Sequence, residues 1–155
     1  MELSQQQKNK LIVGIIAFIL IAVAIVVGVF QKQKFDDLDT LADVARIRSA
    51  LTLSYSINNH FPVAAKPVVV PSVADKTEKL CSTGFYGTQE PCEKILLAPI
   101  PTSSFLNPSF TYSTDNKGLT YQFEFNLRTT HRTLGLTKGV ICARESGLSL
   151  GSCNQ

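Results

Sequence analysis

The sequence contains an uninterrupted run of twenty residues, 11–30, without a charged or polar side chain. As an α-helix this run covers about 30 Å, the thickness of the hydrocarbon core of a bilayer. Apolar side chains occupy every face, so the helix needs lipid or other apolar helices around it, and a chain of 155 residues is too short to bury it in a soluble core. We therefore predict a membrane or filament helix, represented by Leu11, Ile15, Phe18, Gly28 and Phe30.

A cleaved secretory signal is the main alternative to a retained anchor. Ala22-Val23-Ala24 has the small-x-small form of a signal cleavage site. The sequence after it continues as Ile-Val-Val-Gly-Val-Phe, whereas a cleavage site should open onto polar sequence. This continuation favours a retained helix.

The net charge of +3 arises from the flanks of the apolar run. Lys8 and Lys10 precede the run, Lys32 and Lys34 follow it, and Glu2 is the acid that offsets them. Residues 35–155 contain equal numbers of basic and acidic side chains, so the remainder of the chain is neutral. Lysines in such positions extend to the two membrane surfaces, and their equal numbers leave the orientation open.

The four cysteines supply an argument for orientation. Cys81 and Cys92 enclose ten residues, as do Cys142 and Cys153. Four cysteines in a small domain beside a membrane helix fit two disulfides in an oxidising compartment, with three connectivities to choose from. We favour the two local pairs; a zinc site is the alternative, but these spacings lack close ligand pairs. Residues 1–10 are then a cytoplasmic tail or leader, and the C-terminal domain is extracytoplasmic.

Periodicity predicts that the helix continues beyond the membrane. Apolar residues recur at spacings of three and four along residues 31–61 and mark one buried face, at Leu41, Val44, Ile47, Leu51 and Tyr55. Asn58 and Asn59, just before Phe61-Pro62, are suited to ending the helix. Residues 62–108 read as an irregular, disulfide-stapled segment, with an extended linker at 62–71 and helical turns at 75–80 and 93–98.

Residues 109–155 carry the strongest strand signal. Aromatic residues alternate with polar ones on both sides of the turn sequence Asp115-Asn116-Lys117-Gly118, at Phe110, Tyr112, Tyr121, Phe123 and Phe125. Residues 139–143 predict a third strand, tied by Cys142 to the C-terminal end. A hairpin with one apolar face needs a partner, and the helical stripe is the long apolar surface that remains. We therefore predict an α+β fold in which the helix packs on a small antiparallel meander.

This arrangement resembles the type IV pilins and the pseudopilins of type II secretion over most of residues 11–155. Arg46-Ile47-Arg48-Ser49-Ala50-Leu51, followed by Tyr55, Asn58-Asn59 and Phe61-Pro62, looks like the end of the long pilin helix. Residues 97–102, 110–112 and 119–123 are similar to the proline-containing entry and the strand pairs of small pilin-like proteins, and the segment from Cys142 to Cys153 resembles their disulfide-bounded region. The resemblance implies a structural subunit that assembles through its apolar helix with itself and with other components of a pilin system.

The chain departs from that family at the start of the apolar run. Pilin precursors carry a leader that ends in glycine, and a glutamate as the fifth residue of the mature chain. Here Lys10 meets Leu11 directly and Ile15 occupies the position of the glutamate. Two interpretations follow, a divergent filament subunit or a membrane-anchored binding or assembly module that does not polymerise.

Sequence motifs for chemistry are few. Gly147-Leu148-Ser149-Leu150-Gly151 matches a hydrolase nucleophile pattern, but no acid or histidine follows it, so we interpret it as a chance match. His60 and His131 are predicted to be ordinary surface residues. Nucleic acid is a candidate partner, though not the favoured one, for the basic residues Arg128, Arg132, Lys138 and Arg144, which we interpret first as solvated loop charges. We predict no enzymatic activity, no cofactor, no metal and no small-molecule substrate.

Overall fold

The computed structural model describes residues 5–72, 77–101 and 110–153, with side chains from residue 14 onward. The chain forms two compact units, residues 1–35 and 36–155, and each is considered by itself. Expectations for residues 1–4, for Asp75 and for residues 102–109 lie outside the described residues, as does the side chain of Leu11.

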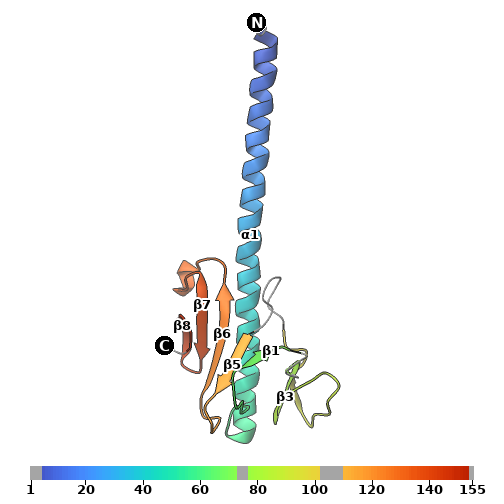
Figure 1. The fold of residues 1–155 in the computed structure, drawn as a ribbon, viewed down its shortest axis with the longest axis vertical. Coiled ribbons are helices and arrows are strands. Elements are labelled where there is room, and N and C mark those ends of the chain that lie inside the picture. Colours follow the sequence, from blue (N-terminus) through green and yellow to red (C-terminus); the bar gives the residue numbers. More distant parts are fainter. Residues whose placement is uncertain (1–4, 73–76, 102–109, 154–155) are drawn as a thin grey trace. The chain divides into compact units, whose positions relative to one another are not determined.

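Helix α1 spans Gln5–Asn58 and is 54 residues long, which confirms the prediction of one long helix (Figure 1). It ends at Asn59, which adopts a left-handed φ of 58°. The Asn59 N–H donates to the carbonyl oxygen of Tyr55 at 2.7 Å. Asparagine tolerates this conformation better than most residues, so it terminates the helix where the sequence predicted.

Five antiparallel strands form the main sheet of the unit at 36–155. Their order is β1-β5-β6-β7-β8, and their bounds are Val68–Val70, Phe110–Thr114, Tyr121–Leu127, Gly139–Arg144 and Gly147–Leu150. The predicted hairpin is β5 and β6, with Tyr112 opposite Phe123. The predicted third strand is β7, whereas β1 and β8 add edges that the sequence did not indicate. Burial alternates along β6 as the aromatic pattern requires.

The helix and this sheet share one hydrophobic core. Val44, Ile47 and Leu51 of α1 are at most 2% exposed and belong to the same buried cluster as the aromatic residues of β5 and β6. The rings of Phe110 and Phe123 stack with centroids 4.8 Å apart. Each such buried side chain contributes about 1.5–3 kcal/mol. The prediction of an α+β fold with its helix on an antiparallel sheet is confirmed.

A second, smaller sheet corrects the prediction for residues 75–98. It consists of β2 (Lys79–Cys81), β3 (Gly84–Tyr86) and β4 (Ile95–Leu97), in the order β3-β2-β4. The helical turns predicted at 75–80 and 93–98 are therefore wrong where the structure describes them. Leu80 is fully buried and pairs with Leu97. The burial of Leu80, with Leu97 partly buried against the core, outweighs the weak local preference of such short segments.

Residues 62–71 were predicted as an extended linker, and this is only half right. They are extended, but Val68–Val70 pairs with β5 as an edge strand, and Val70 is fully buried. Pro67 and Pro71 lie just outside the strand. Proline is tolerated at such edges because it need not donate to the ladder.

Candidate functional site: the apolar helix and the Asp37 cluster

The side chains that the structure describes in the apolar part of α1 are not covered by their own unit. All described side chains from residue 14 to residue 30 are exposed. The exposed fraction reaches 74% at Phe18, and Ile15 and Phe30 are also more than half exposed. Among the described residues, α1 is the one helix long and apolar enough to cross a membrane. This surface therefore requires an apolar environment from outside the chain.

A buried carboxylate links the first turns of α1 in the unit at 36–155 to the end of β6. We call Asp37, Arg128, Thr129 and His131 the Asp37 cluster. The carboxylate of Asp37 accepts the backbone N–H groups of Arg128 at 2.9 Å and Thr129 at 2.7 Å. It also accepts the Thr129 hydroxyl at 2.6 Å and lies 3.2 Å from Nε2 of His131. Its side chain is only 3% exposed.

Two opposing effects act on the pKa of Asp37. Burial raises the pKa, because it disfavours the charged form. Hydrogen bonds from the Arg128 N–H, from the hydroxyl and N–H of Thr129, and from His131 lower it and outweigh burial. The net pKa lies below the ordinary value of an aspartate, so the cluster is built around an ionised carboxylate.

The Asp37 cluster corrects the interpretation of one histidine. His131 was predicted as a surface residue, but its side chain is only 10% exposed and contacts Asp37. His60 is exposed as predicted. Asp37 lies seven residues before Val44 and therefore on the same face of the helix. A search of that face for polar as well as apolar residues could have identified Asp37 as buried.

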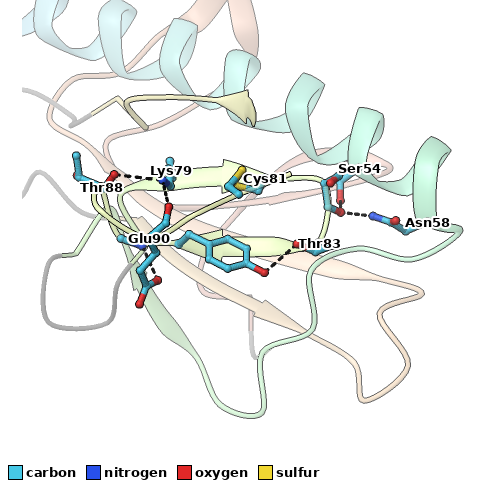
Figure 2. The surroundings of a disulfide bond; sticks show 11 residues. Ser54, Asn58, Lys79, Cys81, Thr83, Thr88 and Glu90 are labelled. Carbon is cyan, nitrogen blue, oxygen red and sulfur yellow. Dashed lines mark hydrogen bonds between the residues drawn. A yellow bond between two sulfur atoms is a disulfide. The ribbon is translucent and has the colours of Figure 1, made fainter. Parts of the chain in front are cut away.

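The first disulfide joins Cys81 to Cys92, as predicted. Figure 2 shows how the segment beside it is tied to α1: Ser54 and Asn58 both donate to the carbonyl oxygen of Ser82, the former at 3.3 Å. The buried Lys79 ammonium donates to the carbonyl oxygens of Thr88, at 3.1 Å, and of Glu90. These contacts fix the disulfide loop against the helix.

The second disulfide joins Cys142 to Cys153, also as predicted. The carboxylate of Glu124 accepts the Ser152 hydroxyl and the Cys153 N–H. Arg144 donates from Nη2 to the carbonyl oxygen of Cys153 at 2.8 Å. The two disulfides account for all four cysteines, so none is left for the alternative zinc site.

The four basic residues considered for an anion do not gather on one face. Arg128 lies beside Asp36, with 3.7 Å between Nη1 and Oδ2. Arg132 and Lys138 are exposed on the connection between β6 and β7. Arg144 lies at the opposite end of β7, at the C-terminal disulfide. Arg128, Arg132 and Lys138 thus share one connection, and Arg144 is separate from them.

An open groove of about 580 Å³ runs between α1 and the sheet at the C-terminal part of the helix. Tyr55, predicted to lie in the helix–sheet core, is instead 37% exposed and lines this groove, with its ring 4.7 Å from that of Phe61. Arg48 contacts the hydroxyl of Tyr121 and the carbonyl oxygen of Glu145, both at 3.3 Å. The groove therefore offers an aromatic wall and a guanidinium that donates two hydrogen bonds within the protein.

The nucleophile-like motif lies in a strand. Gly147–Leu150 is β8, and the Ser149 hydroxyl donates to the carbonyl oxygen of Cys142 at 3.4 Å. A hydrolase serine instead needs a strand-to-helix turn. Among the residues that the structure describes, no group of three or more His, Cys, Asp or Glu side chains is arranged to hold a metal ion.

Comparison of the chain with protein-family models, with curated proteins and with solved structures finds no match.

Proposed function

We propose that this chain is a pilin-like structural subunit of a type IV pilus or a related filament or secretion machine. In this proposal α1 crosses the membrane once, with residues 1–10 in the cytoplasm and the disulfide-bonded unit outside. The apolar run later leaves lipid and packs against the same helix of neighbouring subunits and of other pilin-system components. The proposal assigns no reaction and no cofactor to the chain.

The observation that carries the proposal is the exposed apolar surface of α1 from residue 14 to residue 30. Lipid tails are as apolar as leucine, so exchanging lipid for like helices changes the hydrophobic free energy little. Assembly can therefore rest on side-chain packing, and subunits can be stored in the membrane beforehand. In the outer part of α1, Leu38, Leu53 and Ile57 are each more than 40% exposed, which supports further contacts between copies.

A second candidate function rests on the start of the apolar run. Lys10 directly precedes Leu11, and apolar Ile15 stands where pilins have glutamate. These residues favour a single-pass anchored binding or assembly module that stays in the membrane as a monomer. In this alternative the same helix contacts lipid alone.

Photo-crosslinking in cells distinguishes the two candidates. A photoreactive amino acid replaces Phe18 in the apolar run, and the matched control carries it at Leu119, an exposed residue of the outer unit. The filament proposal predicts a ladder of crosslinked homo-oligomers from position 18 in material sheared from the cell surface. Monomers and lipid adducts alone, confined to the membrane fraction, would favour the anchored module.

A further inference from the structure

The connection between β6 and β7, residues 128–138, concentrates positive charge. It contains Arg128, Arg132 and Lys138 and no acidic residue. Arg132 and Lys138 are exposed. Between them lies Leu134, at the end of the short helix η1 (Arg132–Leu134), with 56% of its surface exposed. An exposed leucine flanked by cations is the composition of segments that rest in the headgroup layer of a membrane.

The Asp37 cluster attaches this connection to a residue that follows the apolar run closely in the sequence. Asp37 receives hydrogen bonds from Arg128 and Thr129, at the start of the connection. Phe30 precedes Asp37 by only seven residues. Seven residues span about 10 Å as a helix and at most about 25 Å when extended. Chain connectivity alone therefore keeps the connection near the membrane surface if residues 11–30 cross the bilayer.

The acidic residues nearby do not cancel this charge. Asp36 is paired with Arg128, and Asp37 is enclosed in its cluster. Asp39 is the exposed acid on this part of α1. Arg132 and Lys138 are both exposed. The surface around the connection, within the unit at 36–155, thus keeps a positive balance.

We propose that the β6–β7 connection docks on the phosphates of anionic phospholipids in the membrane that α1 crosses, through Arg132 and Lys138, with Leu134 inserted between headgroups. This inference rests on the proposed function, since it requires α1 to span the bilayer. Lipid is favoured over nucleic acid because Arg144 lies elsewhere, and because chain connectivity keeps the remaining cations within reach of the membrane surface. Docking would hold the outer unit against the membrane until assembly removes it.

The absence of tryptophan from the chain gives a direct test. Leu134→Trp introduces a single tryptophan, which can be excited selectively, into the full chain. The variant is reconstituted in vesicles that contain a phospholipid with a nitroxide on its headgroup. One set of vesicles is phosphatidylcholine and the other contains phosphatidylglycerol. Leu119→Trp is the matched control, because Leu119 is 49% exposed and precedes the first residue of β6 by two positions. The start of β6 lies at the other end of the strand from the β6–β7 connection (Figure 1).

We expect nitroxide quenching of Leu134→Trp to exceed that of Leu119→Trp, and to be stronger in the phosphatidylglycerol vesicles. A basic residue near an anionic surface changes such an equilibrium about five-fold. Adding Arg132→Gln and Lys138→Gln should therefore reduce the docked-to-free ratio by about 25-fold and abolish the lipid dependence. Equal quenching at the two positions, or quenching unaffected by lipid charge, would overturn the proposal.

Two further measurements separate the explanations. If the chain fails to float with the vesicles, the proposed membrane function fails along with this inference. If it floats but Leu134→Trp is not quenched, only the docking proposal fails. A response of Leu134→Trp to duplex DNA in phosphatidylcholine vesicles, without any response to phosphatidylglycerol, would assign the connection to nucleic acid and overturn the proposal.

Discussion

Replacing the buried carboxylate of Asp37 tests how the outer unit is attached to its helix. Asp37→Asn keeps the size of the side chain but removes the charge, and turns one acceptor oxygen into a donor that faces the N–H group of either Arg128 or Thr129. A hydrogen bond to a charged group is worth about 1.5–3 kcal/mol, and a buried donor left without a partner costs about as much. Since such losses are not additive, we expect a total of about 3 kcal/mol.

The loss should appear as a lower melting temperature of the outer unit. For a unit of this size, about 3 kcal/mol corresponds to a fall in Tm of about 12 °C. The full chain in detergent micelles is heated while near-ultraviolet circular dichroism follows the buried tyrosines Tyr112 and Tyr121. Asp43→Asn is the matched control on the same helix, because Asp43 makes one 3.5 Å ion pair with an Arg46 that is 70% exposed. That variant should change the stability by less than about 0.5 kcal/mol.

The pH dependence has a defined sign. Because the pKa of Asp37 is below its ordinary value, its stabilisation is present above the unfolded pKa of about 4 and is lost as the pH falls through the folded pKa. Burial raises the pKa of Asp43, with Asp39 adding to this and Arg46 opposing it, so its contribution has the opposite sign. Asp37→Asn should therefore flatten the acid limb of the stability curve. A Tm within about 2 °C of the wild type, or an unchanged acid limb, would refute this account of the cluster.

Three other perturbations have defined outcomes. Gly118→Ala should lower Tm more than Gly135→Ala. Both glycines have φ 66°, but a Cβ at Gly118 would lie 2.6 Å from the Phe61 carbonyl oxygen, whereas one at Gly135 meets nothing within 4 Å. Equal shifts in Tm would contradict this expectation. Replacing Cys142 and Cys153 together by serine should cost about 3 kcal/mol in chemical denaturation, as expected for a short closed loop, and an unchanged midpoint would argue against it. Ile47→Ala, at a fully buried position, should cost about 2–5 kcal/mol, whereas Leu53→Ala, 45% exposed, should cost little; similar costs would contradict the helix–sheet core.

The sequence predicts the parts of the fold whose signals are long and periodic. The repeat of Val44, Ile47 and Leu51 and the alternation along β6 identify two surfaces that must meet, and the structure buries them together. The cysteine spacing indicates local disulfides, and these are the pairs formed. In the helix and in β6, the pattern involves several residues that are buried by the same contact.

The sequence does not predict features that depend on partners far along the chain. His131 and Asp37 are 94 residues apart, so nothing near His131 reveals its carboxylate partner. Asp37, Thr40 and Ser54 are buried on the helix but polar, and a search for apolar periodicity omits them. Strands β2 and β4 have three residues each and take their conformation from pairing, which local propensity does not encode.

Electron microscopy of surface appendages, from cells with and without the gene, tests the central claim most directly. Antibodies against the disulfide-bonded outer unit locate the chain along any filament. The proposal predicts labelled filaments that are lost with the gene, and a filament core formed by residues 14–30 of neighbouring copies. Abundant full-length chain in the membrane, with appendages unlabelled and unchanged by removal of the gene, would contradict it.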